Sequence, residues 1–60
     1  MNVFIVLYQH YESGEVEVID VYLDEEKANR RVGFERSMIE ANPDARLRDE
    51  CWYRESEVTA

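Results

Sequence analysis

Few residues in this chain have the types and the spacing that catalysis requires. His10 is the only histidine and Cys51 the only cysteine. A histidine base needs an orienting partner and a pocket, and a cysteine nucleophile needs a positioned base; the sequence places no such group beside either residue. Cys51 precedes Trp52 in an alternating segment, which is typical of a small buried hydrophobe. We therefore predict no catalytic residue and no enzyme.

Metal and cofactor chemistry is not indicated either. One Cys and one His cannot complete a structural zinc site, and the acidic residues follow no calcium-loop pattern. Gly14 and Gly33 are the only glycines and stand far apart, so the chain has no glycine-rich phosphate loop. We predict no metal site and no cofactor.

The acidic residues are concentrated in one stretch. The formal net charge is −7, and the whole excess lies between residues 12 and 26, where no base occurs. We name this set the acidic arm: Glu12, Glu15, Glu17, Asp20, Asp24, Glu25 and Glu26. Alternate strand residues lie about 6.8 Å apart on one face, so Glu15 and Glu17 can begin a row of carboxylates. We expect the arm to bind a protein partner with a basic surface and to repel nucleic acid.

A simpler interpretation of the acidic arm stays open. Excess charge keeps small proteins soluble, and charged edge strands discourage aggregation. The rival interpretation is that the arm imitates a phosphate backbone and occupies a nucleic-acid-binding groove on another protein. The spacing of the carboxylates in three dimensions decides between the two.

Aromatic residues are the second candidates for binding, because tyrosine and tryptophan dominate the energetics of interfaces. If Tyr8, Tyr22 and Trp52 lie on the sheet face away from the helix, Phe4 and Val6 complete an apolar face there. We predict that this face binds a second copy of the chain or another protein. The alternative is that these side chains pack in the core.

The elements that position these residues follow from local patterns. Two β-rich runs, at about residues 3–11 and 15–23, flank Glu12-Ser13-Gly14, whose glycine can adopt a positive φ, and this predicts a hairpin. Asp24 is a helix cap, and a helix is expected over about residues 25–41, ended by Asn42-Pro43-Asp44. An imperfect alternation over 46–58 predicts a third strand, with Leu47, Cys51 and Tyr53 on one side. The fold class is α+β, a three-stranded antiparallel β-β-α-β sheet with one helix on one face.

Both sides of the first strand are apolar. Its two faces are Val3, Ile5 and Leu7, and Phe4, Val6 and Tyr8. One helix covers one face, so the other needs a partner, most simply a copy of itself. Alternatively, this strand is central and the C-terminal tail shields its second face. On the helix, 100° steps predict an apolar face formed by Ala28, Val32 and Ile39 with Phe34, Met38 and Ala41.

The chain has 60 residues, which we interpret as one domain, 1–60, with a core barely large enough to fold alone. The single cysteine excludes an internal disulfide, so self-association is another way in which so small a fold can be stabilised. The apolar run near Met1 follows no basic residue and is too short for a bilayer, so we expect neither a signal peptide nor a membrane partner. The expected location is the cytoplasm, the host's if a phage encodes the protein.

The segments VFIVLYQHYE (residues 3–12) and EVIDVYLDEEKAN (residues 17–29) resemble a family of short uncharacterised bacterial and phage proteins. In that family a tyrosine-rich strand leads through an acidic hairpin to a second strand, and a helix follows that starts with Asp or Ser, two Glu, Lys and Ala. The resemblance implies a ββαβ fold and no function. In size and acidity the chain is also similar in kind to phage-encoded inhibitors of host defence, anti-CRISPR proteins among them, several of which block nucleic-acid sites with carboxylates.

Two functions from different classes are consistent with these features. The first is a non-enzymatic, homodimeric binding protein that inhibits or regulates a basic, nucleic-acid-handling protein through the acidic arm. The second is a structural or assembly subunit whose second sheet face packs against a larger complex, with the acids serving solubility alone.

Overall fold

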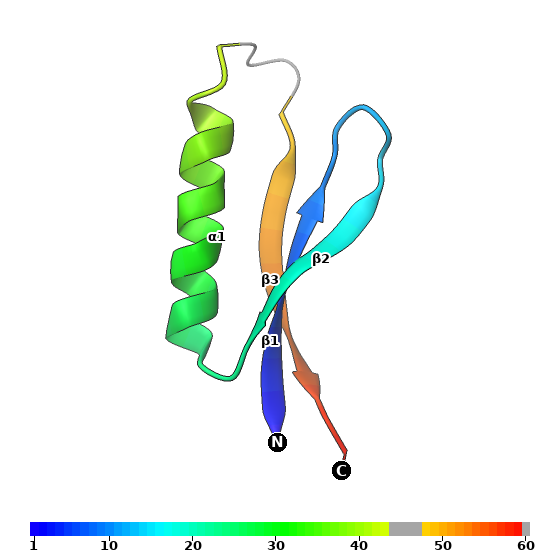
Figure 1. Cartoon of the computed structure of the whole chain (residues 1–60), viewed down its shortest axis with the longest axis vertical. Helices are drawn as coiled ribbons and strands as arrows, with labels where there is room; N and C mark the ends of the chain where they lie inside the picture. Colours follow the sequence, from blue (N-terminus) through cyan, green and yellow to red (C-terminus); the bar gives the residue numbers. More distant parts are fainter. Residues whose placement is uncertain (44–47, 60) are drawn as a thin grey trace.

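Figure 1 shows the computed structural model of the chain, which describes residues 1–43 and 48–59. The elements are β1 (Asn2–Gln9), β2 (Val16–Tyr22), α1 (Glu25–Glu40) and β3 (Glu50–Glu57). The strand order is β2-β1-β3, and β1 pairs antiparallel with both neighbours. Helix α1 lies along one side of the sheet (Figure 1). The predicted α+β fold with a three-stranded antiparallel sheet and one helix is confirmed, and β1 is the central strand.

The turn between β1 and β2 forms where its glycine was predicted to allow it. Gly14 has a φ of 72°, which L side chains rarely adopt. Its N–H donates to the His10 carbonyl at 2.8 Å, and the His10 N–H donates to the Glu15 carbonyl at 2.9 Å. The Ser13 hydroxyl accepts from the Glu15 N–H at 3.1 Å. These bonds fix the register of the hairpin.

Helix α1 begins as its sequence predicts. The Asp24 carboxylate accepts from the Glu26 N–H at 2.9 Å, and Glu25 and Glu26 lie in the first turn, where the helix dipole favours anions. The helix ends at Glu40, before Asn42 and Pro43. Its buried residues are Ala28 and Val32, while Arg31, Glu35 and Ile39 are partly buried.

One part of the helix prediction was wrong. Phe34 and Met38 are each 61% exposed, so they are not part of the face that covers the sheet. Only one narrow stripe of α1 contacts the sheet. Arg31 and Glu35 lie beside this stripe, where both charges are tolerated because they form an ion pair at 2.9 Å. The predicted position of Leu47 lies outside the described residues. Strand β3 begins at Glu50, later than the predicted start at residue 46.

A β-bulge in β2 sets which residues face the helix. Val6 pairs with Asp20 and Leu7 with Val18, so Ile19 is an extra residue. Ile19 packs against the core, and Asp20 forms an ion pair with Arg31 of α1 at 3.1 Å. Because of the extra residue, Val18 and Val21 pair with Leu7 and Ile5 and lie on the opposite face from α1.

The core lies between α1 and the sheet and is small. Its buried residues are Val6, Ala28, Val32 and Cys51. Around them pack partly buried side chains, among them Phe4, Tyr8, Tyr22 and Tyr53. The predicted contact face was therefore wrong for four of its residues: Phe4, Val6, Tyr8 and Tyr22 lie on the helix-covered face. The partly buried Tyr8 hydroxyl has a partner on this side of the sheet: it donates to Asp49, which directly precedes β3, at 2.6 Å.

Candidate functional site

The acidic arm divides into two groups of carboxylates. Glu12, Glu15 and Glu17 lie at the hairpin, whereas Asp24, Glu25 and Glu26 lie at the start of α1. Figure 1 shows the hairpin turn toward one end of the molecule and the start of α1 toward the other. The row of carboxylates that Glu15 and Glu17 begin therefore does not continue to Asp24, Glu25 and Glu26. The bulge at Ile19 and the turn into the helix interrupt the alternation that a straight strand would have.

Most of the arm beyond Glu17 is used by the fold. Asp24 caps α1. Glu26 pairs with Arg30 at 2.8 Å, and Asp20 pairs with Arg31 at 3.1 Å. Glu25 accepts a long hydrogen bond, 3.4 Å, from the Tyr53 hydroxyl. These acids serve the start of the helix and its attachment to the sheet.

Asp20 shows how firmly one of these acids is held. A hydrogen bond from the Tyr22 side chain lowers the pKa of its carboxyl, and the Val21 N–H and the charge of Arg31 lower it further. The Val21 N–H donates to the Asp20 carboxylate at 2.8 Å. The ionised carboxylate therefore has its partners within the molecule and is a poor contact for another protein.

The three acids at the hairpin have fewer partners. We call Glu12, Glu15 and Glu17 the hairpin-end carboxylates. All three are exposed. Within residues 1–43 and 48–59, the side chains of Glu12 and Glu15 form no ion pair. Glu17 Oε1 lies 3.3 Å from His10 Nε2, which forms an ion pair only when the imidazole is protonated.

His10 lies beside a second cluster, at the junction of the hairpin and β3. Its ring contacts that of Tyr8, with centroids 5.0 Å apart. Asp49 accepts from the Tyr8 hydroxyl at 2.6 Å and from the Tyr11 N–H at 2.8 Å. These two bonds, backbone first, lower the pKa of Asp49, while the bond to Asp49 raises that of Tyr8 to about 12. Both tyrosine and aspartate are thus locked in their ordinary charge states, and no nucleophile hydrogen-bonds to His10 among the residues described.

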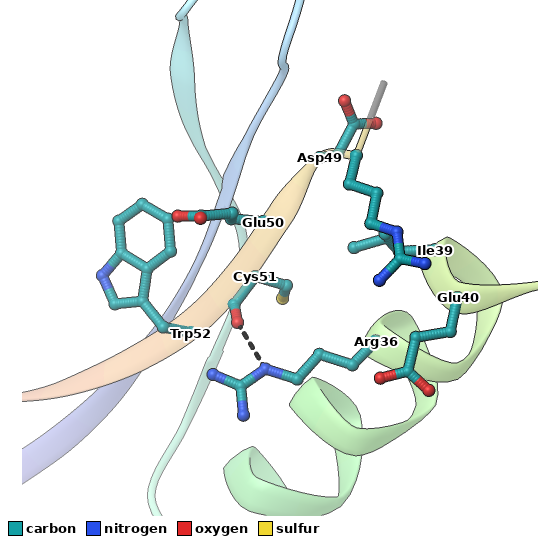
Figure 2. A pocket seen from close by; sticks show the side chains of 8 residues that line it. Arg36, Ile39, Glu40, Asp49, Glu50, Cys51 and Trp52 are labelled. Carbon is teal, nitrogen blue, oxygen red and sulfur yellow. Dashed lines mark hydrogen bonds between the residues drawn. The ribbon is translucent and has the colours of Figure 1, made fainter. Parts of the chain in front are cut away.

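Cys51 faces the helix beside a shallow hollow between α1 and β3. Figure 2 shows Cys51 on the helix side of β3, with Glu50 and Trp52 extending from the other side. Arg36 Nε donates to the Cys51 carbonyl at 3.0 Å, which satisfies a group on the edge of the sheet. Burial raises the pKa of the Cys51 thiol, and Glu35 raises it further. A nucleophilic cysteine needs the opposite shift, so the thiol behaves as a core side chain.

The sheet face opposite α1 is apolar, and the described chain does not cover it. We call it the open face. Strand pairing places Leu7 beside Val18 and Trp52, and Ile5 beside Val21 and Arg54. Val16, Val18 and Val21 are 49%, 58% and 50% exposed, so no tail shields them. The apolar residues of the open face are Val3, Ile5, Leu7, Val16, Val18, Val21 and Trp52.

The open face is electrically balanced. Its charged side chains are Glu50 and Arg54, both exposed and both on β3, two residues on either side of Trp52. A face with one anion and one cation is unusual on a chain whose net charge is −7. The surplus negative charge lies between residues 12 and 26, at the hairpin, in β2 and at the start of α1.

Of the residues predicted for a contact face, only Trp52 lies on the open face. The sequence shows two apolar sets on β1 but not which of them the helix covers. Two features of the sequence indicate which set the helix covers. Tyr8 and Tyr22 have hydroxyls that find hydrogen-bond partners when they are buried, which suits the helix-covered face. Val16 and Val18 alternate with Glu17, which places the two valines together on one face. The aliphatic set is therefore the one left open.

The fold and these surfaces define a small α+β protein with a half-covered sheet. Comparison of the chain with protein-family models, curated proteins and solved structures finds no match. Across the described residues, no group of three or more His, Cys, Asp or Glu side chains could hold a metal ion. The one described helix is too short and too polar to cross a bilayer.

Proposed function

We propose that the protein is a non-enzymatic binding protein that inhibits or regulates a partner with a basic, nucleic-acid-binding surface. The contact is made by the hairpin-end carboxylates. The observation that supports this proposal is the division of the acidic arm: four of its acids are engaged by the fold, whereas Glu12, Glu15 and Glu17 are exposed at the hairpin turn and at the start of β2.

The physical basis of the contact is long-range attraction. A net charge of −7 on a chain of 60 residues attracts a basic groove and accelerates encounter at low salt. The hairpin turn lies toward one end of an elongated molecule, the end at which α1 also finishes, and its carboxylates are exposed there (Figure 1). Nucleic acid itself is repelled by the same charge.

Charge reversal at the hairpin tests the proposal. The variant Glu12→Lys, Glu15→Lys, Glu17→Lys is compared with a control that has the same charge change elsewhere, Glu40→Lys, Glu55→Lys, Glu57→Lys, all of them exposed positions. A protein from the native host is retained on the wild-type chain, identified and purified, and its Kd is measured at 50 and 200 mM salt. We expect the hairpin variant to weaken binding by more than about tenfold and the control by no more than about threefold.

The control separates an effect of the hairpin position from an effect of net charge. Equal losses in the two variants would show that net charge alone attracts the partner, and an unchanged affinity in the hairpin variant would contradict the proposal. Circular dichroism of each variant verifies that the fold is retained.

A second candidate function is that of a structural or assembly subunit, and the open face favours it. A larger complex would cover the valines of β2 and Trp52, and the acids would serve solubility. In that case the hairpin variant keeps its assembly partner, whereas a lysine at Val18, which is 58% exposed, abolishes the association.

A further inference from the structure

We propose that the open face is the interface of a symmetric homodimer, in which two copies stack face to face with their β1 strands antiparallel and Leu7 of β1 near the centre. This inference rests on the open face and makes no use of the hairpin-end carboxylates. It concerns the aliphatic face and the two charges that flank Trp52.

The small core explains why the open face needs cover. Only four residues of the described chain are fully buried between α1 and the sheet. The opposite face presents aliphatic side chains on β1 and β2 and Trp52 on β3, and the valines of β2 are about half exposed. Removing such a surface from water is favourable in proportion to its apolar area. A sheet packed on a second sheet, about 10 Å away, is the usual arrangement.

The charges on the open face indicate that the cover is a second copy of the chain. Glu50 and Arg54 lie at equal spacing, about 6.8 Å along β3, on either side of Trp52. A two-fold axis that crosses the strands at the level of Trp52 places β3 over β3 of the partner subunit in the reverse direction. Each Arg54 then lies over Glu50 of the partner subunit, so both charges are paired.

The other face-to-face symmetry leaves these charges unpaired. A two-fold axis along β1 would place β3 over β2 of the partner subunit. Glu50 and Arg54 would then lie against valines, and unpaired charges are costly to remove from water. A partner with a basic surface does not suit this face either, because the face carries no net charge. The antiparallel stack of two copies is the arrangement that matches both charges.

The size of the face sets the expected strength of the dimer. With the two-fold axis at the level of Trp52, the two faces overlap over about five residues of each strand, a planar area of about 14 by 16 Å per copy. This overlap contains the apolar residues of the open face except Val3, and it is smaller than a standard specific interface. We therefore expect a weak, reversible dimer that dissociates in the upper micromolar range.

Charge exchange on β3 tests this geometry. The variant Glu50→Arg places two cations opposite each other, and Arg54→Glu places two anions opposite each other. The double variant Glu50→Arg, Arg54→Glu restores both pairs with the signs exchanged. Each of these positions is exposed in the single chain, so the substitutions leave folding intact. Sedimentation velocity from about 1 to 500 µM, at 150 mM salt, measures the monomer–dimer equilibrium of all four proteins.

We expect a reversible dimer in the wild type, a loss of at least about tenfold in association for each single variant, and recovery to within about threefold in the double variant. A wild-type chain that stays monomeric over this range would overturn the inference. A double variant that associates no better than the single variants would overturn the antiparallel geometry. Val18→Lys, on the same face but far from β3, abolishes the dimer if the whole face is the interface, and an unchanged dimer in that variant would contradict the proposal.

Discussion

Tyr8 and Asp49 form the strongest polar contact between the central strand and the segment that leads into β3. Their 2.6 Å hydrogen bond is half-buried, and Asp49 also holds the Tyr11 N–H at the start of the hairpin turn. One carboxylate thus connects the end of β1, the turn and the start of β3. The contact requires a protonated tyrosine and an ionised aspartate, and this requirement gives it a defined pH range.

The pH dependence of stability follows from the two shifts. Because the folded chain raises the pKa of Tyr8 from 10.0 to about 12, its contribution is fully present below pH 10 and is lost as the pH rises through 12. The lowered pKa of Asp49 sets the acid limit of this contact. The contribution of Asp49 to stability is present above about pH 4, and it is lost as the pH falls through the lowered pKa of the folded chain. The contact is therefore intact across the neutral range.

Tyr8→Phe tests this range. We expect it to lower the free energy of unfolding by about 1 kcal/mol at pH 7, because a half-buried hydrogen bond is lost. The difference from the wild type should shrink between pH 10 and 12. Urea denaturation at pH 7, 9 and 10.5, at one protein concentration, measures it. Tyr11→Phe is the control, because that ring is 56% exposed. A difference that stays constant with pH would contradict the assigned role of the Tyr8 hydroxyl.

At the scale of the elements, the two glycines have opposite roles. Gly14 has a positive φ that the hairpin turn requires, whereas Gly33 lies in the middle of α1 with ordinary helical geometry. A Cβ atom at Gly33 would meet no heavy atom within 4 Å. The helix therefore carries the conformational cost of a glycine without any close approach that needs one.

Gly33→Ala should stabilise the protein. We expect a gain of about 0.5–1 kcal/mol, from higher helix propensity and a less flexible unfolded chain, and a rise in Tm of several degrees. Gly14→Ala is the matched change and should destabilise by about 1 kcal/mol, because alanine resists a φ of 72°. Thermal denaturation followed by circular dichroism measures both. Equal effects of the two substitutions would show that backbone conformation does not govern either position.

The elements themselves were accessible from the sequence, because each has a local chemical cause. Asp24 caps the helix with its own carboxylate, and Gly14 permits the turn, so neither needs tertiary information. The face that the helix covers was not accessible in this way. It depends on the partners of the tyrosine hydroxyls and on the extra residue at Ile19, which are fixed only when β2, β1 and α1 come together. For the same reason, the acidic arm is contiguous in sequence and divided in space.

At the scale of the whole molecule, the chain is a thin two-layer body of 43 × 22 × 11 Å with helix on one side only. Its surplus of negative charge opposes association with a second copy, whereas its uncovered aliphatic face favours that association. The charge repels another copy at long range, whereas the open face attracts one at contact. Salt changes the first effect far more than the second, because apolar burial is not screened.

The dimer and the complex with a basic partner should therefore respond to salt in opposite directions. Two net charges of −7, about 20 Å apart, repel by roughly 10 kcal/mol in water without screening. The Debye length falls from about 30 Å at 0.01 M to about 10 Å at 0.1 M, which removes most of this repulsion. We expect dimerisation to strengthen at least about tenfold over that range in sedimentation experiments, despite some weakening of the Arg54–Glu50 contacts. Binding of the basic partner should weaken over the same range, because its attraction is screened. A dimer that weakens steadily with salt would show that ion pairs, rather than contacts between aliphatic side chains, stabilise it.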